Sequence, residues 1–222
     1  MYSMFQQGGP VMYVLLAMSV LATAIILMKL YQFGRSGLSQ TDFVDDIVSS
    51  VQRGKYGQAL TDLKDNHHPV AKVLDSLIRF GADATMSTRD VEAEVSRVGS
   101  IEIRNLETWL RSLSSIAHLS PLLGLLGTVT GMIVAFMNLE TAGPQVDPSI
   151  LSGGIWEALL TTAFGLTVAI PAMAAFYYLE GRVDQARAGM KDASIRVLRH
   201  FGKTPHISDR DEGRIEDESH GI

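Results

Sequence analysis

Residues 152–171 read SGGIWEALLTTAFGLTVAIP, and the interpretation of the whole chain follows from this stretch. It is apolar enough to cross a bilayer, yet it contains the carboxylate of Glu157 and the adjacent hydroxyls of Thr161 and Thr162. An ionisable side chain inside hydrocarbon costs about 3 kcal/mol on insertion scales, so it usually faces a bundle interior or a water path. We interpret Glu157 as a functional group. The alternative is a carboxylate close enough to the helix start to reach interfacial water.

The composition argues against several classes of protein. The 222 residues are 46% hydrophobic and include no cysteine, which excludes a disulfide framework, a thiolate nucleophile and a cysteine metal site. The net charge of −5 gives no support to nucleic-acid binding. No nucleophile–base pair or metal-ligand cluster stands out, so we predict neither an enzyme nor a bound cofactor.

Three stretches reach the roughly 20 mostly apolar residues that a membrane-spanning helix needs. They are residues 11–31, 119–139 and 151–179, and the start of the third is ambiguous by a few residues. The first is interpreted as a retained anchor and not a signal peptide, because residues 1–10 contain no basic residue. Its Lys29 is expected to extend its ammonium group to the inner headgroups.

The basic residues predict the orientation of these spans. All 19 Lys and Arg lie between Lys29 and Arg111 or from Arg182 onward. Cytoplasmic segments carry the excess of Lys and Arg, especially near the ends of spans. The N-terminus is therefore expected outside the cytoplasm and the C-terminus inside it.

The segments outside the membrane show helical patterns. Apolar residues recur at helical spacing in residues 43–51, 70–78, 91–113 and 183–201. The helix that starts near Ser87 or Thr88 shows no strong break before Pro121, so one continuous helix with a kink there is expected. The adjacent His67 and His68 are interpreted as part of a solvated loop, because their spacing is poor for binding a metal.

These patterns predict an all-α integral membrane protein with three transmembrane helices, the second and third extended into the cytoplasm, and a helical cytoplasmic segment. The expected order is a short N-terminus outside the cytoplasm (1–10), a transmembrane helix (11–31), a cytoplasmic helical segment (32–118), a second transmembrane helix (119–139), a loop outside the cytoplasm (140–150), a third transmembrane helix (151–179), a cytoplasmic helical extension (180–202) and a disordered acidic tail (203–222).

Rows of small residues predict close packing between the second and third spans. Gly124, Gly127 and Gly131 are spaced by three and four residues in the second span, and Gly165 follows Thr161 by four in the third. Such rows allow helix backbones to approach closely, although they are common in membrane proteins. Thr128 adds a hydroxyl, which in a membrane helix usually bonds to a carbonyl of the preceding turn.

The polar residues of the third span do not share one face. At about 100° per residue, Thr161 lies nearly in line with Glu157, whereas Thr162 lies about 140° away. Both Glu157 and Thr162 can be functional only if this helix touches two partners. The phase therefore favours an oligomer.

The sequences SPLLGLLGTVTGM and SGGIWEALLTTAFGLTVAIPA resemble the second and third spans of the MotA/TolQ/ExbB proton-channel family, and are most similar to ExbB and TolQ. The close match covers residues 120–178, and the flanking segments agree in architecture. The resemblance implies a homopentamer in the bacterial inner membrane. It also implies an ExbD-type single-span partner that carries the transmembrane aspartate, and a TonB-type protein that uses the proton-motive force.

The resemblance assigns Thr128, Glu157 and Thr162 to the polar lining of the ion pathway. Thr161, by its helical phase, is the further candidate. Trp156 and Thr161 stand where relatives more often have small residues, and Thr130 replaces a usual tryptophan. These departures leave proton and sodium both open, because extra hydroxyls can coordinate sodium. A TolQ-type stator of the Tol–Pal system and a non-conducting membrane scaffold are the alternative functions.

Overall fold

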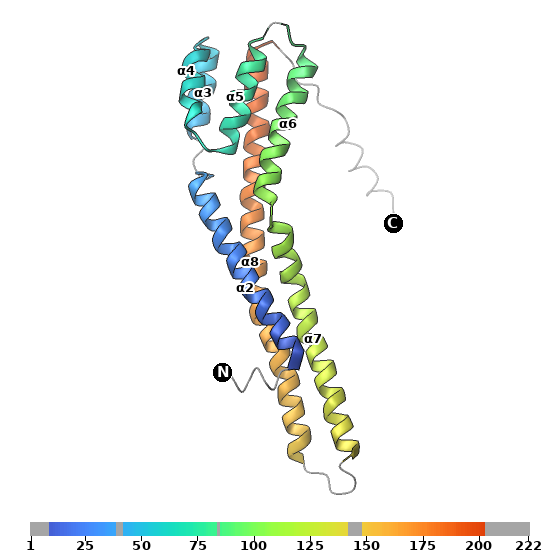
Figure 1. The fold of residues 1–222 in the computed structure, drawn as a ribbon. Coiled ribbons are helices and arrows are strands. Elements are labelled where there is room, and N and C mark those ends of the chain that lie inside the picture. The colour runs from blue at the N-terminus through green and yellow to red at the C-terminus, as the bar shows by residue number, and fades with distance from the viewer. Residues whose placement is uncertain (1–8, 39–41, 84, 142–147, 203–222) are drawn as a thin grey trace, which may run out of the picture. The chain divides into compact units, whose positions relative to one another are not determined.

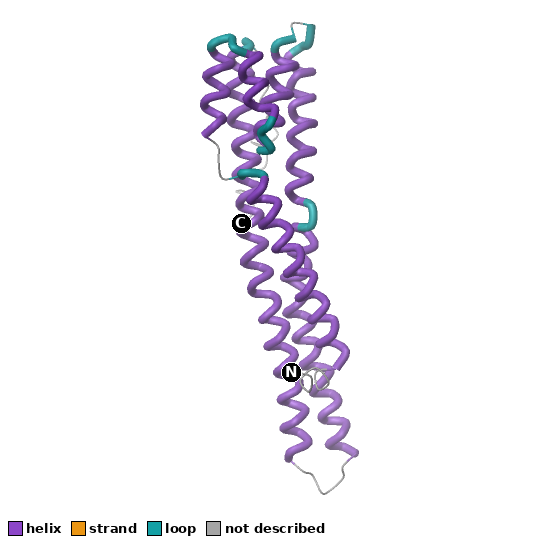
Figure 2. The backbone as a smooth tube through the Cα atoms, turned by 60° about the vertical axis from the view of Figure 1, so that its left-hand side comes forward, coloured by secondary structure: helices purple, strands orange, loops and turns teal. Residues whose placement is uncertain are grey.

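The computed structural model describes residues 9–38, 42–83, 85–141 and 148–202, and for residues 148–150 only the backbone. Within these ranges every regular element is an α-helix, which confirms the predicted all-α class (Figure 2). Three helical stretches in them are long and apolar enough to cross a membrane: Gly9–Arg35, Thr88–Thr141 and Leu151–His200. They contain the three predicted spans. The predicted acidic tail and most of the 140–150 loop lie outside the described residues.

The chain divides into two compact units. The first contains α2 (Gly9–Arg35), α7 (Leu110–Thr141) and the part of α8 (Pro148–His200) that ends at Val183. Helix α2 packs on α7 (Figure 1). The buried residues of α2 recur at helical spacing and form one stripe, while most of its other side chains are apolar and exposed. The stripe consists of Met12, Leu15, Ala22, Ile25, Lys29 and Phe33.

Lys29 corrects one expectation. Its side chain is 1% exposed and its Nζ donates a hydrogen bond to Gln32 Oε1 at 2.8 Å. The ammonium group also lies 5.7 Å from the centre of the Phe33 ring, within the range of a cation–π interaction. Lys29 therefore faces the protein and does not extend away from it toward headgroups, because it stands in the buried stripe of α2.

The expected continuous helix up to Pro121 is wrong. Helix α6 (Thr88–Glu107) ends well before Pro121, and a separate helix, α7, begins at Leu110. The break is a turn at Trp109, whose φ of 68° lies in the left-handed region. A bulky residue is strained there by about 1–2 kcal/mol. No glycine or proline marks this turn, whereas Pro121 lies inside α7.

The second unit contains α3 (Asp42–Gln52), α4 (Tyr56–Lys64), α5 (Pro69–Gly81), α6 and the end of α8. Its core is built from the predicted stripes of these helices, so those predictions are confirmed. The fully buried members include Val48 and Val51 of α3, Leu74, Leu77 and Ile78 of α5, Val91 of α6, and Ala193 and Val197 of α8. Burying a Val, Leu or Ile side chain stabilises a fold by about 1.5–3 kcal/mol.

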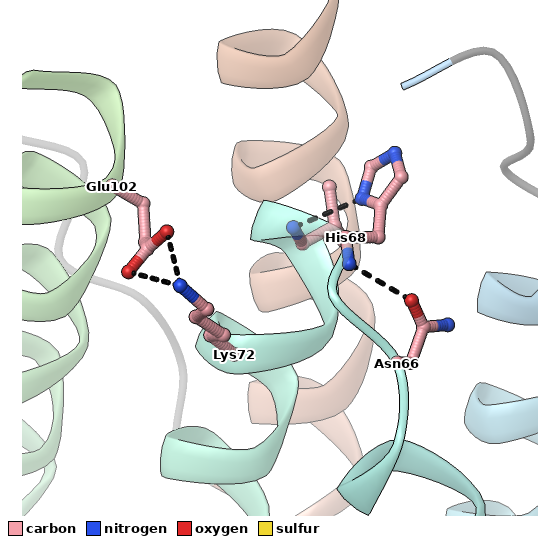
Figure 3. A network of polar contacts seen from close by, with 5 residues as sticks. Asn66, His68, Lys72 and Glu102 are labelled. Carbon is pink, nitrogen blue, oxygen red and sulfur yellow. Dashed lines mark hydrogen bonds and ion pairs between the residues drawn. The ribbon is translucent and has the colours of Figure 1, made fainter. Parts of the chain in front are cut away.

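The polar contacts of this unit fix the helix starts and the approach of α5 to α6. Ser87 Oγ accepts from the Asp90 backbone N–H at 3.2 Å, which caps α6 as expected. Lys72 of α5 forms an ion pair with Glu102 of α6 at 2.9 Å (Figure 3). His68 caps α5, because its Nδ1 accepts from the Val70 N–H at 3.1 Å.

His68 is buried at 3% exposed, which contradicts the predicted solvated loop. Its backbone N–H donates to Asn66 Oδ1 at 2.9 Å (Figure 3). Its ring meets the Phe43 ring edge-on at 5.2 Å between centroids. A ring that caps through Nδ1 must carry its proton on Nε2. Nε2 is buried and has no hydrogen-bond partner among the described residues. Burial lowers the pKa of His68, although a contact with the Leu38 backbone opposes this shift.

We predict that this unit loses stability in acid. His68 has a lowered pKa in the folded protein and is neutral there. Its contribution to the free energy of unfolding is therefore complete above the unfolded pKa of about 6.5, and it is lost as the pH falls from that value through the folded pKa. His68→Asn keeps a capping oxygen that does not titrate, and it should remove this part of the pH dependence. Thermal unfolding of the detergent-solubilised protein at pH 7.5 and 5.5 measures the effect. The control is His67→Asn, because His67 is exposed. An equal loss of thermal stability between pH 7.5 and pH 5.5 in both variants would contradict the prediction.

Candidate functional site

Helices α7 and α8 meet along a row of small residues, here called the seam. On α7 it consists of Ser120, Gly124, Gly127, Gly131 and Ala135, and on α8 of Gly154, Ala158, Thr161 and Gly165. A methyl group added to Gly131 would lie 3.1 Å from Ala158 Cβ, and one added to Gly165 would lie 2.7 Å from the Ser120 carbonyl oxygen. Residue numbers rise on one helix as they fall on the other, so the two helices are antiparallel. All four glycines predicted to pack lie in this seam.

The threonines at the seam differ in their surroundings. Thr162 is partly buried, and its hydroxyl donates to the Gly124 carbonyl of α7 at 2.9 Å. Thr161 is 2% exposed, and its hydroxyl donates within α8 to the Ala158 carbonyl at 2.7 Å. It reaches the Gly124 oxygen only at 3.4 Å. Thr162 therefore stands at the edge of the helix pair, whereas Thr161 lies inside it.

Thr128 and Thr162 lie on the same side of the seam. At about 100° per residue, Thr162 lies about 70° to one side of the centre of the α8 seam residues. Thr128 lies about 60° from the centre of the α7 seam residues, and in an antiparallel pair this rotation leads to the same side. The Thr128 hydroxyl donates to the Leu125 carbonyl at 2.6 Å. We call this side, with Thr128 and Thr162, the hydroxyl flank.

The hydroxyl flank can accept hydrogen bonds. Both hydroxyl hydrogens are used by backbone carbonyls, of Leu125 and Gly124 respectively, while each oxygen keeps a lone pair. Such oxygens suit a protonated carboxyl group or a cation. Among the described residues, no cluster of three or more His, Asp or Glu side chains could hold a metal ion.

Glu157 lies on the opposite flank, about 70° from the centre of the α8 seam residues. Its side chain is half-buried, and no hydrogen bond or ion pair joins it to another described residue. The structure therefore brings Thr128 and Thr162 together and leaves Glu157 apart from them. This agrees with the helical phase of Glu157 and Thr162 along the sequence.

Two seam groups were not singled out from the sequence. Ser120 is fully buried, its hydroxyl donates to the Ile116 carbonyl at 2.7 Å, and its own carbonyl faces Gly165. The Gly124 carbonyl is the acceptor for Thr162. Ser120 precedes Gly124 by four residues, so extending the glycine row by one turn would have identified it. A backbone acceptor has no sequence signal.

The fold and this site define a polytopic membrane protein whose second and third spanning helices pack closely and carry hydroxyls at the edge of their contact. Residues 58–192 match the model of the MotA/TolQ/ExbB proton channel family. The chain belongs to this family.

Named relatives agree with this assignment. An ExbB homolog of Methanothermobacter thermautotrophicus is 31% identical over 182 residues, which is 82% of this chain and 63% of that protein. The biopolymer transport protein ExbB of Neisseria meningitidis serogroup A is 27% identical over 79% of this chain and 84% of its own length. The Tol-Pal system protein TolQ of Haemophilus influenzae is 41% identical over 47% of this chain and 48% of its own length. The chain thus spans less than two thirds of two of these three relatives.

The seam predicts a contrast between two glycines of α8. Alanine at Gly165 would press against the α7 backbone, and overpacking of this kind costs about 1–3 kcal/mol. Alanine at Gly153 would meet nothing within 4 Å and should gain up to about 1 kcal/mol from helix propensity. Thermal unfolding in detergent should therefore show Gly165→Ala less stable and Gly153→Ala at least as stable as the wild type. Equal stability of the two variants would mean that the helices are not in close contact at Gly165.

Proposed function

We propose that this chain is the ExbB-like subunit of an inner-membrane proton-channel or stator complex that couples the proton-motive force to TonB-dependent transport across the outer membrane. The observation that carries the proposal is the half-buried carboxylate of Glu157 in an apolar helix, without a partner among the described residues. An intramembrane carboxylate of this kind marks an ion path or a contact with another protein more often than a structural role.

A second copy of the chain offers no Lys or Arg to Glu157 from the membrane-spanning parts of α7 and α8. No Lys or Arg occurs in residues 112–181. Glu157 must therefore be stabilised by protonation, by water, by hydroxyls or by a different polypeptide. Protonation, water and hydroxyls fit a pathway through which ions pass, whereas a fixed ion pair with a different polypeptide would fit the scaffold alternative.

The hydroxyl flank supplies the second part of the proposal. Thr128 and Thr162 offer acceptor oxygens at the edge of the helix pair, where a partner helix can approach. A protonated carboxyl on such a helix could donate to them, and sodium could coordinate to them. We favour the proton, because the family whose model matches this chain is described as a proton channel family.

The proposed assembly follows the family. It is a homopentamer around an ExbD-type single-span protein that carries the transmembrane aspartate, with a TonB-type protein as the element it drives. Glu157 and the hydroxyl flank lie on opposite sides of α8, which supports a helix that touches two neighbours. The distribution of Lys and Arg supports a periplasmic N-terminus and a cytoplasmic C-terminus.

A TolQ-like stator of the Tol–Pal system is the second candidate. The 41% identity to the TolQ protein of Haemophilus influenzae favours it, although that match covers 47% of this chain. The site chemistry is the same in both candidates, so the driven partner decides between them. Co-purification of the native complex with either a TonB-type protein or Tol components separates the two.

We predict that Glu157→Ala abolishes proton flux and energised siderophore uptake while the oligomer still assembles, because the change removes a charge and adds no bulk. Glu157→Gln keeps the shape and the hydrogen-bonding capacity without the ability to ionise, and it should be equally inactive if ionisation is required. Proton flux in vesicles of native membranes and the size of the purified complex are the two measurements. Normal flux in both variants would exclude Glu157 from the ion path, whereas an absence of flux in the wild type itself would favour the non-conducting scaffold.

We predict a smaller effect for the hydroxyl flank. Thr128→Val and Thr162→Val each remove one polar group, and a transmembrane hydrogen bond contributes about 0.6 kcal/mol, or about a threefold loss of flux. Repetition around a ring should enlarge this loss. The control is Thr167→Val, because Thr167 is exposed on another face of α8 and donates within its own helix, as Thr128 does, to the Ala163 carbonyl at 2.8 Å. If Thr167→Val lowers the flux as much as the two flank variants, the hydroxyl flank is not the pathway.

A further inference from the structure

Thr161 fills a space that Gly127 leaves open on the facing helix. A Cβ added to Gly127 would meet Thr161 Oγ1 first, and it would lie 2.7 Å from Thr161 Cβ, closer than side chains approach in practice, and 3.1 Å from its Cγ2. The other side chains that limit the seam glycines are alanines, at Ala135 and Ala158. Gly127 and Thr161 therefore form a matched pair of a small and a larger residue.

The hydroxyl of Thr161 is not available to a pathway. The residue is 2% exposed, and its donor is used within α8 by the Ala158 carbonyl at 2.7 Å. What Thr161 contributes to the contact with α7 is mainly the volume of its branched side chain. Its stiff χ1 angle holds that volume in one place.

The effect of this volume falls on the next residue, Thr162. Thr162 donates across the seam to the Gly124 carbonyl at 2.9 Å, and Gly124 lies one turn from Gly127 on α7. Hydrogen bonds weaken steeply when distance or angle departs from the optimum. A slide or rotation of α8 against α7 would therefore break this bond, and the side chain of Thr161 against Gly127 opposes such a movement.

We propose that Thr161 is a positioning residue, which sets the register of α7 and α8 through its contact with Gly127 and so holds the Thr162 hydroxyl on the Gly124 carbonyl. The functional part of this proposal rests on the proposed ion pathway. The structural part does not. It replaces the assignment of Thr161 to the polar lining, which rested on helical phase alone.

The structural part is tested by exchanging volume between the two helices. Gly127→Ala should destabilise the purified complex. Adding Thr161→Ala should restore part of the lost thermal stability, because it removes the Oγ1 and Cγ2 atoms that face the new methyl group and leaves only the Thr161 Cβ. Gly165→Ala is the matched control, since its obstruction is backbone of Ser120 and Gly124, which Thr161→Ala cannot relieve. If Thr161→Ala fails to rescue Gly127→Ala, or rescues Gly165→Ala equally well, the matched pair is refuted.

The functional part is tested by proton flux in vesicles of native membranes. Thr161→Ala should lower the flux about threefold in the wild-type background and hardly at all when Thr162 is already Val, because one hydrogen bond cannot be lost twice. A merely structural role would give the same factor in both backgrounds and would overturn the proposal. Thr161→Val keeps the branched volume and should leave the flux nearly normal. A severe loss in Thr161→Val would instead make the hydroxyl itself functional.

The two proposals fail in different ways. If Glu157→Ala and Thr162→Val both leave the flux normal, the pathway is wrong, and the exchange between Gly127 and Thr161 still decides whether the register contact exists. If those two variants lose flux but Thr161→Ala and Thr162→Val lower it independently, the pathway stands and the positioning role of Thr161 is wrong.

Discussion

The close approach of the α7 and α8 backbones is the constraint on which the polar site depends. In a bilayer, apolar side chains gain little by leaving lipid for a neighbouring helix, so spans associate through close van der Waals packing and interhelical hydrogen bonds. In this protein, glycine residues make both the close packing and the interhelical hydrogen bond possible. The missing side chain of Gly165 lets the Ser120 carbonyl come near, and the missing side chain of Gly124 lets the Thr162 hydroxyl reach a backbone oxygen at 2.9 Å. A single methyl group in the wrong place would alter the polar groups as well as the packing.

The seam also divides the surface of α8 into two flanks. Glu157 lies on one and Thr162 on the other, so one partner cannot contact both through a narrow surface. A ring of identical subunits would give both flanks a partner, because each copy of α8 then contacts a neighbouring subunit on one side and the protein at the centre of the ring on the other. The same geometry matches the spacing of Glu157 and Thr162, which are five residues apart and therefore about 140° apart around the helix.

The sequence predicted the features that depend on local pattern. The three apolar spans and the helices of the second unit follow from length and periodicity, and the buried stripes of α3 and α5 are those expected. Features set by tertiary contact were missed. Lys29 is buried because α2 packs on α7, His68 because it caps a helix inside a core, and Trp109 adopts a positive φ without a glycine or proline signal. Helical phase placed Thr161 near Glu157 but could not show that α7 covers it.

The energies involved limit which parts of the proposed complex can move. One charge crossing 100 mV releases about 2.3 kcal/mol, whereas a transmembrane hydrogen bond contributes about 0.6 kcal/mol. The energy released by one proton is therefore enough to break and re-form a few hydrogen bonds to hydroxyl groups. Separating α7 from α8 would require losing the contacts of the whole seam, and sliding them would press the side chain of Thr161 against the neighbouring turn of α7. The helix pair is thus better suited to act as a rigid wall. Motion driven by the proton should occur where the hydroxyl flank meets a partner helix, since that contact can be exchanged one hydrogen bond at a time.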